Sequence, residues 1–152
     1  MLKRLVPAAA AGAAALLASL LAAPAQAAAT PVVMFTKVYF DSPGSDRGGN
    51  TSLNGEYVVL KNTTSKSIQM ERWILRDKTG YRFAFPRFTL KPGKSVTVRS
   101  GQGKNSSTTL FWQRKWYVWN NTGDNAGIYR GSDLKKIDTC SWGSAGDWTN
   151  CK

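Results

Sequence analysis

The stretch Lys91-Pro92-Gly93-Lys94-Ser95-Val96-Thr97-Val98-Arg99 contains both a turn signal and a strand signal. Proline followed by glycine is the order that the central positions of a type II turn favour. After this turn, valines alternate with polar residues, and a period of two is typical of a strand that buries one face. The stretch therefore predicts a turn at 91–94 that leads into a half-buried strand at 95–99.

Further short runs rich in β-branched and aromatic residues follow the same plan, and clusters of turn-forming residues separate them. These runs are Val32–Phe40, Glu56–Lys61, Ile68–Leu75, Tyr81–Phe85, Leu110–Trp119, Ala126–Arg130 and Leu134–Thr139. The segment 41–54, which holds several glycines, is expected to be a polar loop. About eight short strands with regular turn signals predict one all-β domain, a sandwich or barrel of antiparallel strands.

The N-terminal residues have the order of a secretory signal peptide. Lys3 and Arg4 precede an apolar run at 5–23, and Ala25-Gln26-Ala27 offers the small-x-small pattern of a cleavage site. A membrane-spanning helix is the alternative, because the run is just long enough to cross a bilayer. Its high alanine content and the cleavage pattern favour removal. We therefore expect a signal peptide at 1–27, a domain at 28–152, and a secreted, extracellular bacterial protein without a stable membrane anchor.

The charge balance is strongly basic. Lysine and arginine number 21 against 9 acidic residues, and histidine is absent, which makes the formal net charge +12. Removing 1–27 would take away two basic residues and no acid, leaving +10. Such a charge favours anionic partners such as nucleic acid, cell-wall polymer, acidic glycan or lipid headgroups. The alternative is that the charge only keeps an exported protein soluble.

The two cysteines, Cys140 and Cys151, lie close together near the C-terminus. In an oxidising compartment an even number of cysteines at close spacing predicts a disulfide. A loop this short would stabilise the fold by roughly 3 kcal/mol in the chain-entropy model. Two thiols without histidine make a poor metal site, so the bridge is expected to be structural.

Four blocks of sequence occur in the order found in a known family. They are Glu56–Asn62 followed by Trp73–Asp77, Phe83–Pro86 followed by Leu90–Gly93, Val96–Gly103, and Val118–Ala126. Together they span about residues 33–142, and the chain resembles the lamin-tail domain family. The resemblance implies an immunoglobulin-like antiparallel β-sandwich that serves as a binding or interaction module. We expect an exported bacterial stand-alone member, without a fused enzyme.

Catalytic machinery is not evident. The absence of histidine removes the commonest general base and the triads built on it. Paired carboxylates remain open as an alternative, with Glu56 and Asp124 as candidates, although Glu56, Asp77 and Asp124 are expected instead to bind loop amides or basic side chains. Asp41 and Asp46 offer a weak calcium signal. We expect no catalytic residue, no metal and no cofactor.

The best candidate for binding is the aromatic and basic segment 111–119. Trp112 and Trp116 flank Arg114 and Lys115, so rings could stack on bases or sugars while the cations meet phosphate or carboxylate. The alternative is that these large rings fill the sandwich core.

The sequence as a whole predicts a secreted, monomeric, non-catalytic binding or structural module that engages an anionic polymer. A small secreted hydrolase with paired carboxylates and a module that binds another protein are the alternatives.

Overall fold

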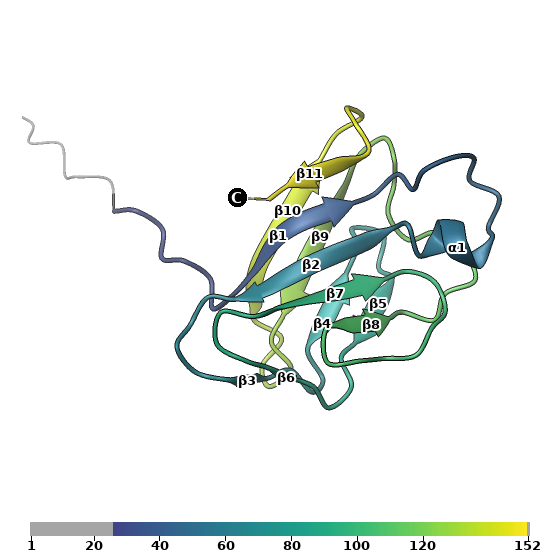
Figure 1. Cartoon of the computed structure of the whole chain (residues 1–152). Coiled ribbons are helices and arrows are strands. Elements are labelled where there is room, and N and C mark those ends of the chain that lie inside the picture. Colours follow the sequence, from purple (N-terminus) through teal and green to yellow (C-terminus); the bar gives the residue numbers. More distant parts are fainter. Residues whose placement is uncertain (1–25, 152) are drawn as a thin grey trace, which may run out of the picture.

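The computed structural model describes residues 26–151, so nearly all of the predicted signal peptide 1–27 lies outside the described residues. Within that part the chain forms one short helix and eleven strands (Figure 1). In chain order these are β1 (Val33–Tyr39), α1 (Asn50–Leu53), β2 (Tyr57–Asn62), β3 (Ile68–Gln69), β4 (Ile74–Arg76), β5 (Arg82–Ala84), β6 (Thr89–Leu90), β7 (Ser95–Arg99), β8 (Thr109–Phe111), β9 (Asp124–Tyr129), β10 (Lys136–Trp142) and β11 (Trp148–Asn150).

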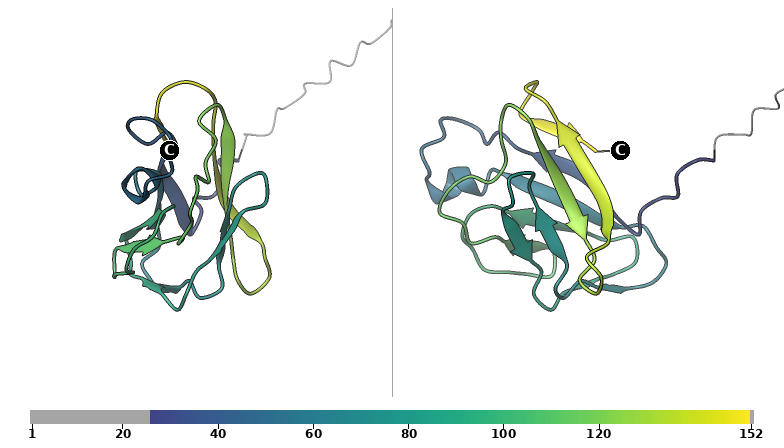
Figure 2. Two further views of the ribbon diagram at one scale, coloured as in Figure 1. Left: turned by 90° about the vertical axis from the view of Figure 1, so that its right-hand side faces the viewer. Right: turned by 180° about the vertical axis from the view of Figure 1, so that it is seen from behind.

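The strands form two facing layers, which Figure 2 shows edge-on in its left view. One layer is a five-stranded sheet in the order β11-β1-β2-β7-β8, and the other is a four-stranded sheet in the order β10-β9-β4-β5. A third, two-stranded sheet joins β3 and β6. This arrangement confirms the predicted all-β, immunoglobulin-like sandwich.

One strand pair departs from the expected antiparallel pairing. β7 and β8 pair in parallel, with Thr97 opposite Thr109 and Arg99 opposite Phe111. The segment 100–108 returns along β7 toward its start before β8 begins. Both strands therefore run in the same direction. All the other strand pairs of the described residues are antiparallel.

The core lies between the two large sheets and is built by alternation. In β7, Val96 and Val98 are buried while Thr97 and Arg99 are half-exposed, as the period of two predicts. Aromatic and aliphatic side chains from both layers complete this core, including Phe35, Phe40, Leu60, Trp73, Leu75, Leu110, Trp119 and Ile128.

Some predicted boundaries are wrong. The region 68–75, expected to contain one strand, holds β3 and the start of β4 instead, because Arg72 adopts a left-handed φ of 65° and the chain passes there from the small sheet into β4. The expected polar loop 41–54 contains the helix α1, and the predictions missed β6 and β11. These missed elements are two to four residues long, too short to show a period.

The C-terminal strand is linked to the opposite layer. β11 pairs with β1 in the five-stranded sheet, whereas Cys140 lies in β10 of the four-stranded sheet. The sulfur atoms of Cys140 and Cys151 are 2.09 Å apart, so the two predicted cysteines lie at disulfide distance. The bridge thereby joins the edges of the two layers.

Candidate functional site

The predicted binding segment lies in a loop rather than in a strand. β8 ends at Phe111, and Gln113 takes a left-handed φ of 64°, which breaks the alternation expected for Leu110–Trp119. The amides of Gln113 and Arg114 donate hydrogen bonds to the carbonyls of Gly101 and Ser100, each at 3.0 Å. The loop 112–123 is therefore held against the segment that leaves β7, and the expectation of one long strand here is wrong.

A buried carboxylate anchors the second half of this loop. Glu56, which directly precedes β2, is fully buried. Its two carboxylate oxygens accept hydrogen bonds from the amides of Val118 and Trp119, each at 3.0 Å. Burial raises the pKa of Glu56 to about 7, although the two amide hydrogen bonds oppose that rise.

Two further carboxylates hold neighbouring turns in the same way. Asp124 accepts hydrogen bonds from the amides of Lys78 at 3.2 Å and Asn120 at 3.1 Å. Asp77 accepts from the amides of Gly80 and Tyr81 at 2.7 Å each. Both acids are buried. Glu56 and Asp124, the two carboxylates considered for a hydrolase, therefore both accept hydrogen bonds from loop amides.

The acids considered for calcium lie at the same end of the molecule. Partial burial and the nearby charges of Asp46 and Asp147 raise the pKa of Asp41. Between residues 26 and 151, however, no group of three or more His, Cys, Asp or Glu side chains is arranged to hold a metal ion. The geometry lends no support to the calcium hypothesis.

The four residues predicted for binding occupy different environments. Trp112 is half-buried and packs against the core, with ring centroids 5.7 Å from Phe83 and 5.8 Å from Trp119. Arg114 is half-buried, Lys115 is exposed, and Trp116 is 57% exposed. Of the four residues, only Lys115 and Trp116 are exposed, whereas Arg114 is half-buried and Trp112 contributes to the packing of the core.

Trp116 stands on a supported platform. Its ring meets Tyr117 edge to face, with the centroids 5.4 Å apart. The Tyr117 hydroxyl is hydrogen-bonded to the hydroxyl of Ser52 at 2.6 Å and accepts the amide of Gly48 at 3.3 Å. Ser52 of α1 and Gly48 before it therefore hold Tyr117 in place, and Tyr117 in turn supports the exposed indole of Trp116.

A second exposed ring lies beside this platform. The guanidinium carbon of Arg114 is 4.1 Å from the ring centroid of Tyr81, which is 44% exposed. The sequence did not single out Tyr81, because the alternation of 81–85 places it on the same face as the buried Phe83 and Phe85. It is exposed because β5 begins only at Arg82.

We call the group Tyr81, Arg114, Lys115, Trp116 and Tyr117 the Trp116 surface. Two shallow clefts of about 290 and 340 Å³ are both lined by Trp116 and Tyr117. The first also has Asn120, Asn121 and Asp46 in its wall, and the second has Thr79 and Tyr81. The walls of these clefts are made of aromatic, amide, hydroxyl and carboxylate groups, and Arg114 and Lys115 lie next to Trp116 in sequence but outside both linings. The exposed indole is suited to a polar ligand with a stacking face.

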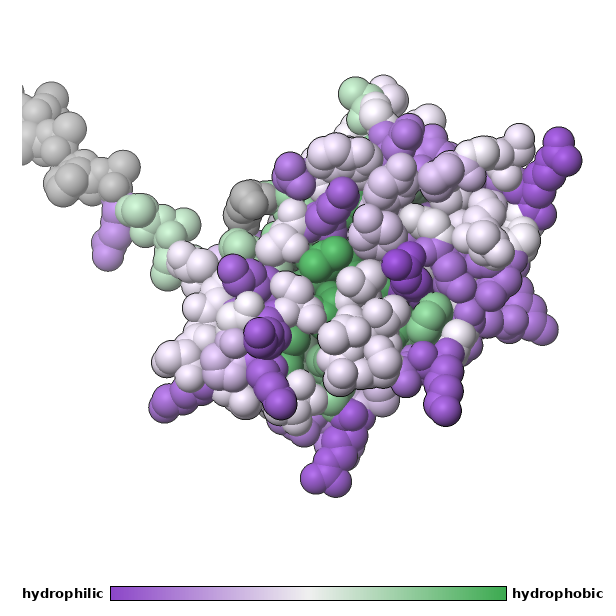
Figure 3. Space-filling view, viewed as in Figure 1, coloured by the Kyte–Doolittle hydropathy of each residue, from purple (hydrophilic) through white to green (hydrophobic). Residues whose placement is uncertain are grey.

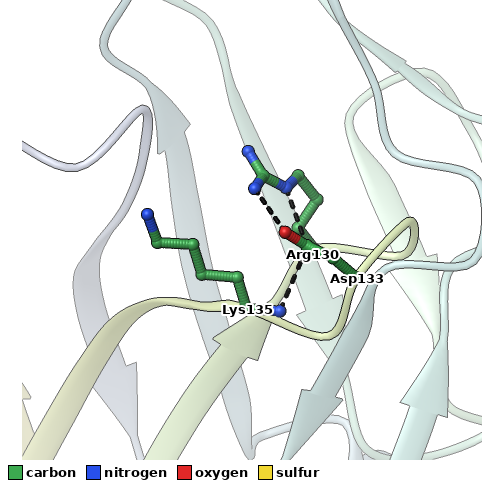
Figure 4. A network of polar contacts seen from close by, with 3 residues as sticks. All are labelled: Arg130, Asp133 and Lys135. Atoms are coloured by element: carbon green, nitrogen blue, oxygen red, sulfur yellow. Dashed lines mark hydrogen bonds and ion pairs between the residues drawn. The ribbon is translucent and has the colours of Figure 1, made fainter.

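The surface charge is more positive than composition suggests. Four acids, Glu56, Asp77, Asp124 and Asp138, are buried, whereas no described lysine or arginine is. Among residues 26–151 one ion pair occurs, between Arg130 and Asp133 at 2.6 Å (Figure 4). The Arg130 hydrogen bond, assisted by the Lys135 amide, lowers the pKa of Asp133 to about 2.

Comparison with protein families agrees with the architecture. The family model of the Lamin Tail Domain, a family of non-catalytic domains with an immunoglobulin-like fold, matches residues 26–144. In the described part of the chain no helix is long and apolar enough to cross a membrane. The matched region includes both large sheets except β11, together with the whole Trp116 surface. The chain therefore belongs to the Lamin Tail Domain family.

Proposed function

We propose that this protein is a secreted, non-catalytic module that binds an anionic polymer through the Trp116 surface. The predicted signal peptide 1–27 and the cysteine pair at disulfide distance support secretion. Membership of a non-catalytic family supports a binding role. The polymer is a cell-wall polymer, an acidic glycan or a nucleic acid, all of which repeat a negative charge along a chain.

The observation that carries the proposal is the separation of the charges. Four carboxylates point inward and bind backbone amides, so they compensate little of the positive charge that a ligand meets at the surface. Apart from Arg130, no described cation has a carboxylate within 4.0 Å. Unpaired surface cations attract a polyanion and gain from releasing its counterions.

The Trp116 surface supplies contact as well as charge. Arg114 and Lys115 would neutralise phosphate or carboxylate groups, while the indole of Trp116 stacks on a sugar ring or a base. Glu56 fixes the backbone of the loop, and Tyr117, held by Ser52, supports the Trp116 ring. The ligand therefore meets a surface that is already ordered.

The test is binding of the purified protein to cell-wall sacculi, DNA and hyaluronan over a salt series. Binding should weaken steeply as salt rises, because charge neutralisation drives it. Trp116→Ala should weaken it by about tenfold or more, the scale of one stacking contact. Lys115→Gln should lower both the affinity and its salt dependence.

Matched controls lie in the β9–β10 hairpin, with Leu134 in its turn and Lys136 at the start of β10. Leu134→Ala removes an equally exposed apolar side chain, and Lys136→Gln removes a charge from the other adjacent basic pair. Both should leave binding close to wild type. Failure to bind any of the three polymers at low salt would overturn the proposal, as would binding that does not respond to salt.

A further inference from the structure

A second surface crosses the outer face of the five-stranded sheet. Five residues that are register partners on adjacent strands form one row across it, in the order Trp148, Tyr39, Tyr57, Arg99 and Phe111. All five point away from the core, because the neighbouring Val38, Val58, Val98 and Leu110 are buried. The row lies at the end of the sheet nearest α1 (Figure 1).

Two cations pack against the rings of this row. The ammonium nitrogen of Lys37 is 4.2 Å from the Trp148 ring centroid and 5.8 Å from that of Tyr39. Tyr39 and Tyr57 stack with centroids 5.5 Å apart, and the Arg99 guanidinium carbon is 5.1 Å from the Tyr57 centroid. We call Lys37 and the five register partners the cross-sheet row.

The strands of this face carry charge of one sign. The strands β1, β2, β7, β8 and β11 contain no acidic residue and three basic ones, Lys37, Lys61 and Arg99. Figure 3 looks onto this face and shows mostly pale residues of intermediate hydropathy, a green strip near the middle, and purple hydrophilic groups that project around it. The nearest acids along the chain lie outside the strands: Glu56 directly precedes Tyr57 but is buried, Asp147 directly precedes Trp148, and Asp41 follows β1.

The row leads into a groove. Its last two members, Arg99 and Phe111, also line an open groove of about 890 Å³ whose other wall is α1 and the residues before it. That wall adds the exposed guanidinium of Arg47 and the exposed Thr51. A linear ligand on the row would therefore continue into the groove, between Arg99 on one wall and Arg47 and Thr51 on the other.

We propose that the cross-sheet row is a binding track for an acidic polysaccharide that runs across the strands. The inference rests on the proposed function for the charge of its ligand, and it names the polymer class and a second contact surface. Lys37 and Arg99 lie on β1 and β7, two strands apart, and Lys37 reaches over Trp148 of β11, away from Arg99, so the two cations are spread along the row. A polymer that repeats a carboxylate along its length can meet both of them.

The row favours a glycan over a nucleic acid because the faces of its two central rings, Tyr39 and Tyr57, are already occupied. Base stacking requires an open aromatic face. Here Tyr39 and Tyr57 stack on each other, Arg99 lies over Tyr57, and Lys37 lies over Trp148. The tyrosine pair therefore presents ring edges and hydroxyls beside charged groups, which suit sugar hydroxyls and carboxylates.

The experiment measures binding of the purified protein to hyaluronan, with dextran as the neutral polymer and oligo-dT as the nucleic acid. Hyaluronan should bind at low salt and dextran should not. Lys37→Gln should weaken hyaluronan binding about fivefold, the scale of one partly exposed cation contact. Trp148→Ala should weaken hyaluronan binding at least as much. Lys37→Arg, which keeps the positive charge, should bind hyaluronan as wild type does.

Lys61→Gln is the matched control, because Lys61 is exposed on the same face of β2 but four residues from Tyr57 and outside the row. Urea unfolding of each variant checks that the fold is intact. If Lys37→Gln and Lys61→Gln have the same effect, the inference is wrong. Row variants that weaken oligo-dT binding and leave hyaluronan binding unchanged would also overturn it.

Trp116→Ala in the same assay separates the two proposals. Hyaluronan binding that depends on Trp116 but not on the row would overturn this inference and leave the proposed function standing. Failure of hyaluronan, oligo-dT and sacculi to bind would overturn both.

Discussion

Glu56 makes stability depend on pH in an unusual direction. It is fully buried, and burial raises its pKa to about 7 from an ordinary value of 4.5. The folded protein therefore holds this proton more tightly than the unfolded chain does. The contribution of Glu56 to stability is fully present below pH 4.5 and is lost as the pH rises through 7.

The size of this loss follows from the shift. Between pH 5 and 8, ionisation of Glu56 should lower the free energy of unfolding by about 2–3 kcal/mol. In Glu56→Gln this titration is absent. The variant also turns an amide nitrogen toward a backbone N–H of Val118 or Trp119, and the unpaired buried donor costs about 1–3 kcal/mol.

We therefore expect Glu56→Gln to be less stable than wild type at pH 5 and to close most or all of that gap by pH 8. Urea unfolding at fixed ionic strength, followed by tryptophan fluorescence, measures both curves. The absence of histidine keeps this pH window free of the residue that usually dominates it. Glu71→Gln, which changes an exposed glutamate, should give a curve parallel to wild type. A stability gap between Glu56→Gln and wild type that stays constant from pH 5 to 8 would refute the reasoning.

Two further predictions concern the C-terminus and the Trp116 surface. Reducing the Cys140–Cys151 bridge should lower the free energy of unfolding by about 3 kcal/mol, measured as urea curves with and without reductant; equal curves would contradict its stabilising role. Gly48→Ala should cost about 1–2 kcal/mol and change the Trp116 fluorescence, because Gly48 has a φ of 74° and a Cβ there would lie 2.4 Å from the indole. Gly49→Ala, whose Cβ would meet nothing within 4 Å, should do neither, and equal effects of the two substitutions would count against this account.

The strands that alternate over five or more residues were predictable because their period is local. β7 coincides with the predicted 95–99, and β1 lies within the predicted 32–40. Loop 112–123 was not predictable in the same way. Its residues have strand-forming side chains, but the left-handed Gln113 and the hydrogen bonds to Ser100, Gly101 and Glu56 make it a loop.

Sequence alone determined the all-β class, the family and the pairing of Cys140 with Cys151, because composition, period and ordered motifs are properties of the linear chain. Tertiary structure decided which charges and rings meet a ligand. It buried Glu56 and Asp124 against amides from distant loops, placed Tyr81 beside Arg114, and aligned Trp148, Tyr39 and Arg99 across one sheet face. These contacts join residues far apart in sequence, and they exist only once strand register and layer packing bring those residues together.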